Sequence, residues 1–405
     1  MRAFTNYLFL NNKKISILVL GYLGNVVYYD QNEVSCFSTG MSIVNAKDLK
    51  SIIYDILKRA ESFIQNSITD FILVLDDCRT EFKTIEIEKN LQTQSQISKK
   101  DILKLEQKAK EISLTEDFEV FAIKPSYVVL DDTSLHFYIP YDMSCSKFLM
   151  GITMMGFDSV VFNSIKYILN ECSINILKTI NSIALTALCV FEKSENFDVN
   201  SWKSVLYIGS DFSTLLVFRG DCFCFFDTID VGFVNILEQI SQYLDIQYGD
   251  AEDVFDIAVK FNQSVHGSGI GGDSDNHFSL DNKTLHDTYD VIQRNVFSIV
   301  NTCVNNINSA NKDVLKRSFF DVVLSPDISS KITPIELIKL DSVTTTLKCF
   351  HYNFNQELKS SQEDYYYKKN DLHMECSTHF LTSFNRGGLK INQLSFRDFV
   401  LNLIS

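Results

Sequence analysis

Hydrophobic residues recur along this chain with two periods, and the alternation of these periods predicts strands and helices in turn. Short apolar runs predict strands at residues 15–20, 26–30, 35–44 and 71–75. The apolar residues 1–10 lack the basic region and cleavage site of a signal peptide, so we expect them to form a first strand. Apolar residues at helical spacing predict a helix after these strands: Leu49, Ile52, Ile53, Ile56, Leu57, Ala60 and Phe63.

A polar passage at residues 88–100 interrupts this pattern and indicates that a different module opens there. Within this module we expect one helix, at residues 100–112, and three strands, at residues 118–123, 127–130 and 135–141. Helix, strand and helix then return at residues 159–170, 173–177 and 183–191. The charged residues 193–200 that follow are expected to form a hinge between two lobes.

The most informative stretch is residues 202–261, where three strands and a helix are predicted in close succession. The strands are expected at residues 205–209, 215–218 and 222–226, and the helix lies between Gly232 and the pair Ala251-Glu252. Further on, the pattern predicts a long helix, a strand, a polar tyrosine-rich linker and an apolar end, at residues 285–309, 319–324, 356–393 and 394–405.

Composition limits the classes of function. A hydrophobic content of 45% with 22% charged residues is typical of a folded protein, and 405 residues exceed the needs of one core. The net charge of −14 argues against nucleic acid as a partner, because phosphate backbones need a dense basic surface. No apolar run is long enough to span a membrane. The ten cysteines have no paired spacing, which favours buried thiols in a reducing cytoplasm.

Three local motifs suggest chemistry, and each has a simpler explanation. The glycine-rich residues 267–272 lack the strand and helix that flank a dinucleotide loop, so a surface loop is favoured. His373, Cys376 and His379 have a spacing that zinc uses, but the sequence shows no fourth ligand near them. Cys222 and Cys224 share one face of a strand, as core residues do. We therefore assign no metal site and no catalytic residue.

Five segments, in one order along the chain, resemble the bacterial cell-division FtsA family. They are Ser38-Thr39-Gly40-Met41 with Ala60-Glu61, Ile97-Ser98-Lys99-Lys100-Asp101, residues 121–127 with Leu130-Asp131, residues 202–261, and Val291-Ile292-Gln293-Arg294. The pilus-assembly protein PilM is the second choice for the relative that these segments resemble. The resemblance implies an α/β, actin-like (ribonuclease H-like) two-lobe fold with a small inserted α+β subdomain.

The resemblance also implies domain boundaries. The first lobe would take residues 1–78 and 158–196, with the inserted subdomain at residues 79–157. The second lobe would take residues 197–355, of which 226–309 form its variable subdomain. Residues 356–393 would be a linker, and residues 394–405 an amphipathic C-terminal segment.

The residues that bind nucleotide in this family are mostly replaced. Phe9, Tyr207 and Thr214 stand where the family has metal-positioning or phosphate-loop Asp residues, and Asn11 stands for a glycine. The pocket that remains would be vestigial, formed by Gly209, Ser210, Asp211, Gly232, Glu252 and Ser325. Phosphate loops need glycine so that backbone N–H groups approach the anion, and Asp211 would repel it. We expect no ATPase activity and no firmly bound cofactor, although the resemblance leaves ATP with magnesium open.

The resemblance therefore implies an adaptor. Such a protein tethers the FtsZ polymer to the cytoplasmic face of the membrane at the division site, self-associates and recruits later division proteins. Arg294 is the nearest match to the family residue that binds the FtsZ C-terminal tail. Peripheral membrane contact would use Phe396, Phe399, Val400 and Leu403, which give apolar area with few cations. The alternatives are a nucleotide-binding actin-like filament ATPase and a PilM-like pilus-assembly scaffold.

Overall fold

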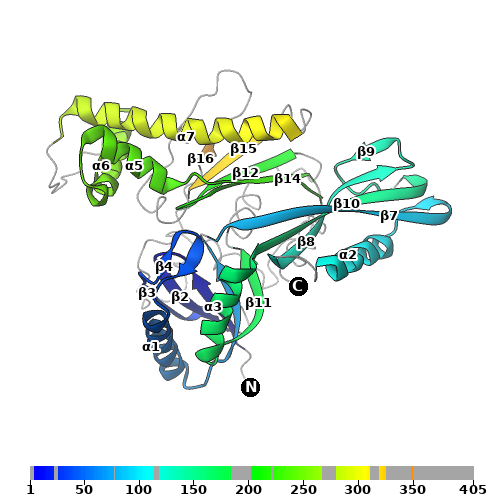
Figure 1. The fold of residues 1–405 in the computed structure, drawn as a ribbon, viewed down its shortest axis with the longest axis horizontal. Helices are drawn as coiled ribbons and strands as arrows, with labels where there is room; N and C mark the ends of the chain where they lie inside the picture. Colours follow the sequence, from blue (N-terminus) through cyan, green and yellow to red (C-terminus); the bar gives the residue numbers. More distant parts are fainter. Residues whose placement is uncertain are drawn as a thin grey trace. The chain divides into compact units, whose positions relative to one another are not determined.

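The structure is a computed structural model (Figure 1). The chain divides into two compact units. The first unit contains Met1–Lys203 and Leu216–Phe226, and the second contains Ser204–Leu215 and Asp227–Leu372. The residues that the structure describes are 4–21, 26–76, 78–113, 118–141, 143–181, 183, 202–219, 222–266, 280–310, 319–324 and 348–349.

The first unit is built on a five-stranded sheet with the order β11-β6-β1-β2-β3. Neighbours β1, β2 and β3 are antiparallel, whereas β1 is parallel to β6 and β6 is parallel to β11. Tyr7, Leu8 and Leu10 of β1 are all buried, which places this strand in the sheet interior as its apolar sequence predicts. The bounds are Thr5–Leu10 (β1), Lys14–Leu20 (β2), Val26–Glu33 (β3), Asp70–Leu75 (β6) and Asn175–Asn181 (β11).

Two amphipathic helices bury their apolar faces in one core with this sheet. They are α1, Ala46–Ile64, and α3, Ser159–Glu171. The side chain of Asp158 caps α3 by accepting the N–H groups of Val160 and Val161, both at 2.9 Å. The core contains alternate residues of the central strands and one stripe of each helix: Leu8, Leu10, Ile15, Ile17, Leu73, Leu75, Leu49, Ile53, Ile56, Ala60, Phe162, Ile165 and Leu169.

The strand that the sequence predicts at residues 35–44 is divided. It forms β4 (Phe37–Ser38) and β5 (Ser42–Ile43), which pair with each other across a short 3-10 turn at Thr39–Met41. Gly40 and Met41 have positive φ angles of 68° and 66°. Backbone of this kind cannot continue a strand, so the prediction of one strand was wrong.

A second, four-stranded sheet with the order β7-β10-β8-β9 is inserted between β6 and α3. One helix, α2 (Lys99–Ser113), packs on it, and its core includes Ile102, Leu105, Phe148 and Met150. The strands are β7 (Thr80–Gln96), β8 (Phe118–Leu130), β9 (Ser134–His136) and β10 (Ser144–Asp158). This is the inserted α+β subdomain that the sequence predicts.

The polar passage at residues 88–100 was interpreted wrongly as the opening of this module. Most of it is the second half of β7, a strand at the edge of the sheet with β10 as its neighbour. An edge strand exposes much of its surface and can carry many polar residues, so the apolar pattern that predicts a strand is missing from this one. The strands expected at residues 118–123 and 127–130 are one strand, β8, and the strand expected at 135–141 is limited to β9.

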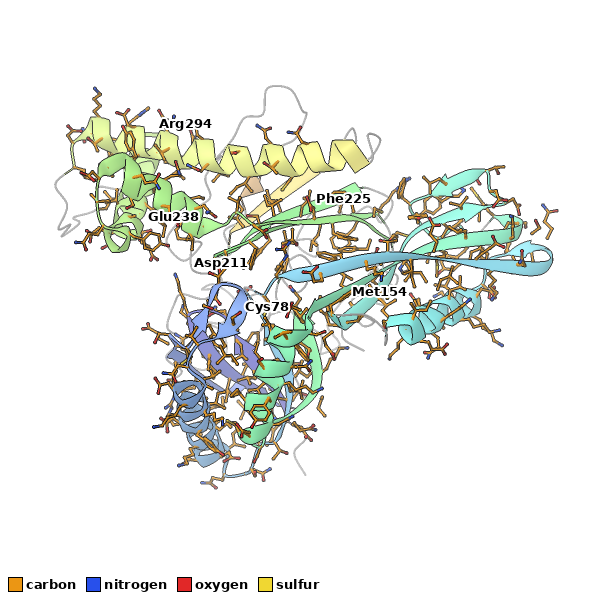
Figure 2. The ribbon with its side chains drawn as sticks, viewed as in Figure 1. Cys78, Met154, Asp211, Phe225, Glu238 and Arg294 are labelled. Atoms are coloured by element: carbon orange, nitrogen blue, oxygen red, sulfur yellow. The ribbon has the colours of Figure 1, made fainter. Side chains whose placement is uncertain are left out.

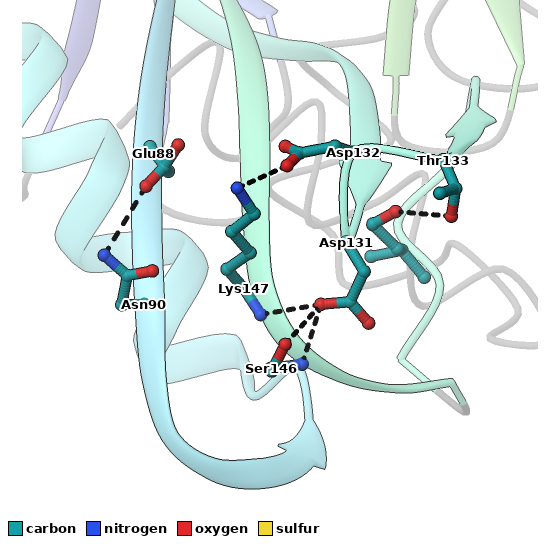
Figure 3. A network of polar contacts seen from close by, with 8 residues as sticks. Glu88, Asn90, Asp131, Asp132, Thr133, Ser146 and Lys147 are labelled. Carbon is teal, nitrogen blue, oxygen red and sulfur yellow. Dashed lines mark hydrogen bonds and ion pairs between the residues drawn. The ribbon is translucent and has the colours of Figure 1, made fainter.

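A polar network fixes the turn between β8 and β9 onto β10 (Figure 3). Asp131 Oδ1 accepts the backbone N–H groups of Ser146 and Lys147, both at 3.0 Å, and the hydroxyl of Ser146 at 2.7 Å. Lys147 also forms an ion pair with Asp132. Asp131 and Asp132 have φ angles of 45° and 58°, a left-handed backbone that Asp tolerates better than most residues. The Ser146 hydroxyl and the nearby N–H groups hold the pKa of Asp131 below its ordinary value.

The third sheet has the order β14-β13-β12-β15-β16. Its strands are β12 (Trp202–Ile208), β13 (Ser213–Arg219), β14 (Cys222–Ile229), β15 (Phe319–Leu324) and β16 (Lys348–Cys349). Within the first unit, β14 also contacts the inserted sheet: the rings of Phe82 and Phe226 stack with centroids 4.0 Å apart. Cys222 is part of the inserted subdomain's core.

Three helices of the second unit pack against one another (Figure 1). They are α5 (Phe233–Leu244), α6 (Tyr248–His266) and α7 (Asn282–Ala310). The sequence predicts α5 and α7 from their helical spacing, whereas α6, which contains Ala251 and Glu252, was not predicted as a helix of its own.

The strand order repeats between the first and third sheets. In each, the first strand in sequence lies between the second and the fourth, and the third and fifth strands lie at the two edges. The predicted α/β, actin-like (ribonuclease H-like) fold with an inserted subdomain is confirmed by this duplicated order.

Candidate functional site

The segment that the sequence predicts to be a vestigial phosphate loop is a tight turn between β12 and β13 in the second unit. The N–H of Gly209 donates to the carbonyl oxygen of Phe212 at 2.9 Å, which closes the turn over Ser210 and Asp211. Tyr207, the last residue but one of β12, is 2% exposed and belongs to the buried core. Figure 2 shows Asp211 at this turn.

The first turn of α5 is hydrogen-bonded directly to this loop. The N–H of Phe233 donates to the Gly209 carbonyl oxygen at 2.9 Å, and the N–H of Val234 donates to that of Ser210 at 3.0 Å. The N–H of Gly232 donates to the side-chain oxygen Oδ1 of Asn235 at 2.8 Å. The structure thus brings together Gly209, Ser210 and Gly232, as the sequence predicts for the pocket.

These hydrogen bonds occupy the N–H groups at the start of α5, which could otherwise bind an anion. The free N–H groups at a helix N-terminus are an anion site, because they point outward and the helix dipole is positive there. In this chain the N–H groups of Gly232, Phe233 and Val234 all have acceptors within the protein. A phosphate bound here would have to displace the acceptors of these N–H groups, so the geometry favours a closed loop over a nucleotide pocket.

Three carboxylates act on the phenol of Tyr248, the first residue of α6. Burial raises the pKa of Tyr248, and the carboxylates of Glu238, Glu252 and Asp211 raise it further. Three carboxylates therefore lie near one phenol at the start of α6. A polyphosphate placed here would face like charges, which Coulomb repulsion disfavours.

The turn between β1 and β2, in the first unit, is closed by its own side chain. Asn11 Oδ1 accepts the backbone N–H groups of Lys13 at 2.9 Å and Lys14 at 2.6 Å. The Asn11 N–H donates to the Lys14 carbonyl oxygen at 3.0 Å. The resemblance puts the first phosphate loop at this turn, and the amide N–H groups that would bind an anion are already bonded. The sequence indicated only that Asn11 replaces a glycine.

The positions at which the resemblance would place loop carboxylates hold other groups. Phe9 contacts the ring of Tyr7, with centroids 6.5 Å apart. The hydroxyl of Thr214 lies 3.3 Å from that of Thr228. Neither side chain supplies a charged oxygen, and magnesium prefers such oxygens as ligands. Among the described residues, one close group of potential metal ligands occurs, His286, Asp287 and Asp290, and it is on the surface of α7.

Arg294 lies elsewhere, in a groove between α5 and α7 of the second unit. The groove has a volume of about 460 Å³ and is lined by Gln239, Gln242, Tyr243, Val291, Arg294 and Asn295. The Nε atom of Arg294 donates to the Asp290 carbonyl oxygen at 3.2 Å, which holds the exposed side chain along α7. Figure 2 shows Arg294 on α7 and Glu238 on α5. The glutamines and Tyr243 that share this groove were missed, because their exposed positions carry no motif.

Several predicted residues lie outside the described part of the chain. These are Ser325 of the vestigial pocket and the expected membrane contacts Phe396, Phe399, Val400 and Leu403. The glycine-rich residues 267–272 and the His373, Cys376 and His379 spacing also lie outside it. In the helices that are described, none has the length and apolar character needed to cross a bilayer.

No protein-family model and no curated protein sequence matches this chain. Among solved structures it is similar to the PilM-PilN type IV pilus biogenesis complex, with 11% identity, 80% of this chain and 82% of that chain covered, and a TM-score of 0.48. It is also similar to MreB5 of Spiroplasma citri bound to ADP, at 10% identity, coverage of 85% and 91%, and a TM-score of 0.45. A third similar structure is the ethanolamine utilization protein EutJ of Carboxydothermus hydrogenoformans. It is 8% identical, the match covers 80% of this chain and 77% of that chain, and the TM-score is 0.42.

Proposed function

We propose that this chain is an FtsA-like adaptor that uses an actin-like fold for recognition, without ATP hydrolysis. The observation that carries the proposal is the closed phosphate loop, in which Phe233 and Val234 donate their N–H groups to Gly209 and Ser210. The capped β1–β2 turn supports it, because Asn11 Oδ1 accepts the N–H groups of Lys13 and Lys14 at the other loop position. The adaptor would tether the FtsZ polymer to the cytoplasmic face of the membrane and recruit later division proteins.

The α5–α7 groove supports a peptide as the ligand. Its amide side chains offer donors and acceptors that suit a peptide backbone, and Arg294 offers a charged fork for a carboxylate. The resemblance makes the FtsZ C-terminal tail the first choice of peptide. Self-association and membrane contact through Phe396, Phe399, Val400 and Leu403 belong to the same proposal.

Thermal unfolding with ATP and magnesium tests the loss of nucleotide binding. A ligand at about 100 times its dissociation constant stabilises a protein by about 2.7 kcal/mol, which shifts Tm by several degrees. We expect no such shift with ATP, ADP or a non-hydrolysable analogue. A shift of several degrees, abolished by chelating magnesium, would favour the alternative of a nucleotide-binding filament ATPase.

Binding of a labelled FtsZ tail peptide, measured by fluorescence anisotropy, tests the groove. Arg294→Glu should weaken binding about tenfold or more, since it replaces an attractive charge with a repulsive one. Lys108→Glu is the matched control, because it makes the same charge change on an exposed position of α2. Equal affinities for the two variants would remove the groove from the proposal. Absence of binding to the unmodified chain would favour a PilM-like scaffold.

Lipid co-sedimentation tests the membrane contact. The full chain should pellet with anionic vesicles, and a chain ending before residue 394 should remain in solution. If the shortened chain pellets equally well, the C-terminal assignment fails, and the peptide-binding result stands independently.

A further inference from the structure

The outer side of α2, the helix of the inserted subdomain, is basic. The helix buries Ile102, Leu105 and Ala109 in the core that it shares with the inserted sheet. Five of its 15 residues are lysines, and all five are exposed, although the chain has a net charge of −14. We call these five lysines and the exposed Leu103 the basic face: Lys99, Lys100, Leu103, Lys104, Lys108 and Lys110.

The lysines of the basic face form no ion pair with another residue in the described part of the chain. The helix α1 of the same unit differs, because it pairs Lys50 with Glu171 and Arg59 with Asp30. The cations of α1 are thus partly neutralised within the protein, whereas those of α2 face the solvent. Their charge is available to a partner outside the chain.

The acidic residues of α2 offset little of this charge at the surface. Asp101 forms an ion pair with Lys89 of β7, and both side chains are largely buried. Glu106 is half-buried, and Glu111 is the exposed acid of this helix. Charges at the surface act mainly within a Debye length, about 8 Å at physiological ionic strength. The basic face therefore attracts a nearby anionic surface although the whole molecule is acidic.

An exposed leucine lies among these lysines. The side chain of Leu103 is 59% exposed. Lys99 and Lys100 precede it by four and three residues, so they are its neighbours on the helix surface, and Lys104 follows it directly. Helices that lie on anionic bilayers combine apolar side chains with a cluster of lysines in this way.

The form of this face favours a bilayer over a peptide as the partner. Peptides are held in grooves or along the edges of sheets, whereas the outer side of a helix is convex. A bilayer can surround the tip of Leu103 with its headgroups. Lysine ammonium groups on long flexible stems can reach several headgroups at once.

We propose that the basic face of α2 is a second contact with a membrane surface that contains anionic lipids. The inference rests on the proposed peripheral membrane contact, since residues 394–405 offer apolar area with few cations and α2 supplies the missing charge. Two weak contacts on one chain hold it to a membrane far more tightly than either alone, because the second forms at a high effective concentration. Loss of either contact should then release the chain.

Co-sedimentation of the full chain with phosphatidylserine–phosphatidylcholine vesicles tests the basic face. Each lysine near an anionic surface contributes about fivefold in affinity, so Lys100→Gln combined with Lys104→Gln should weaken binding about twentyfold. Lys47→Gln combined with Lys58→Gln is the matched control, because it removes two exposed lysines from α1. The control should bind within about twofold of the unmodified chain, since its net charge changes equally but α2 is intact. Near-ultraviolet circular dichroism confirms that each variant is folded.

The apolar part of the contact has its own variant. Leu103→Ser should weaken binding about threefold, because it removes the side chain that enters the headgroup region. Leu135→Ser is its control, since Leu135 is 53% exposed on β9 of the same subdomain and should not affect binding. Added salt should weaken binding of the unmodified chain strongly and that of the double lysine variant less.

The outcomes separate this surface from the C-terminal contact. Release by the α2 lysine variant but not by the α1 control supports the basic face, and equal effects of the two overturn it. If shortening the chain before residue 394 releases it while the α2 variant still binds, the C-terminal contact stands and the basic face is wrong. If the α2 variant is released while the shortened chain still binds, the basic face stands and the C-terminal assignment fails.

Two further results would overturn the proposal. Lack of binding by the unmodified chain to the anionic vesicles removes both membrane contacts and leaves the peptide test of the α5–α7 groove unaffected. Soluble polyglutamate is the probe for an acidic protein as the partner. If it binds more tightly than the vesicles, with the same dependence on Lys100 and Lys104 and none on Leu103, the bilayer assignment is wrong.

Discussion

The backbone of Gly232 approaches that of Ser210 so closely that a Cβ atom on Gly232 would lie 2.3 Å from the Ser210 carbonyl oxygen. It would also lie 2.7 Å from the carbonyl carbon of Asp211. The φ angle of Gly232 is −139°, an extended value open to any residue, so the requirement for glycine is one of space. Glycine is required at this position because the start of α5 packs against the loop. In a phosphate loop, by contrast, glycine is required because it lets backbone N–H groups approach the anion.

Gly232→Ala should therefore destabilise the protein. The atoms it meets are backbone and cannot rotate away, so we expect a loss of about 1–3 kcal/mol in the free energy of unfolding. Gly249→Ala is the control, because no atom lies within 4 Å of a Cβ at that position in α6. Alanine favours helix over glycine by up to about 1 kcal/mol, so this variant should be neutral or stabilising. Denaturant unfolding measures both, and equal stabilities would contradict the close packing of loop and helix.

Asn11 provides a second test of a closed loop. Asn11→Ala leaves the Lys13 and Lys14 N–H groups without their side-chain acceptor, and we expect a loss of about 1–2 kcal/mol in stability. Asn11→Asp keeps an acceptor in the same place and should lose less. If the two variants unfold at the same denaturant concentration, the hydrogen bonds from Lys13 and Lys14 contribute little.

Asp101 links the stability of the inserted subdomain to pH. Ser98 and Asp101 cap α2 reciprocally: the Ser98 N–H donates to Asp101 Oδ2 at 3.0 Å, and the Asp101 N–H donates to the Ser98 hydroxyl at 3.2 Å. Hydrogen bonds from Lys89 and then Ser98 lower the pKa of Asp101 from 3.8 to about 2. Because the folded pKa is the lower one, this stabilisation is complete above pH 3.8 and is lost as the pH falls to about 2.

Urea unfolding as a function of pH should reveal this contribution. Allowing for solvent screening, Asp101→Asn should be less stable than the unmodified chain by about 1 kcal/mol near neutral pH, and the difference should vanish near pH 2. Glu111→Gln removes an exposed acid of the same helix and should leave the pH profile unchanged. A pH-independent difference for Asp101→Asn would show that the ion pair with Lys89 is unimportant.

The sequence predicted the elements that bury one clear face. The α1 stripe and the apolar β6 were predicted from hydrophobic spacing, since their side chains meet one core. The edge strand β7 escaped detection because most of its described residues are exposed or only half-buried and many are polar. The β4–β5 division escaped too, because it depends on the positive φ angles of Gly40 and Met41.

The sequence predicted that Gly209, Ser210 and Gly232 would lie together, but it did not predict the hydrogen bonds that join the loop to α5. The substituted residues at Gly209–Phe212 indicated a lost phosphate loop. They did not indicate that the N–H groups of α5 bond to this loop. Those hydrogen bonds join backbone atoms, so they do not depend on the side chains that the sequence specifies.

Lys178 should reduce the stability of the folded chain at neutral pH. Its pKa is about 8 in the folded state against 10.5 in the unfolded chain, because burial disfavours the charged form. The folded state then binds fewer protons between these values, so stability should rise as the pH increases from about 8 to 10.5 and stay at its lower level below 8.

Lys178→Met keeps the apolar stem and removes the charge. Allowing for solvent screening, it should stabilise the protein by about 1 kcal/mol near neutral pH, with the gain disappearing towards pH 10.5. Lys108→Met, at an exposed position, should show no such pH dependence. A destabilised Lys178→Met at neutral pH would mean that the ammonium has a partner which compensates its burial.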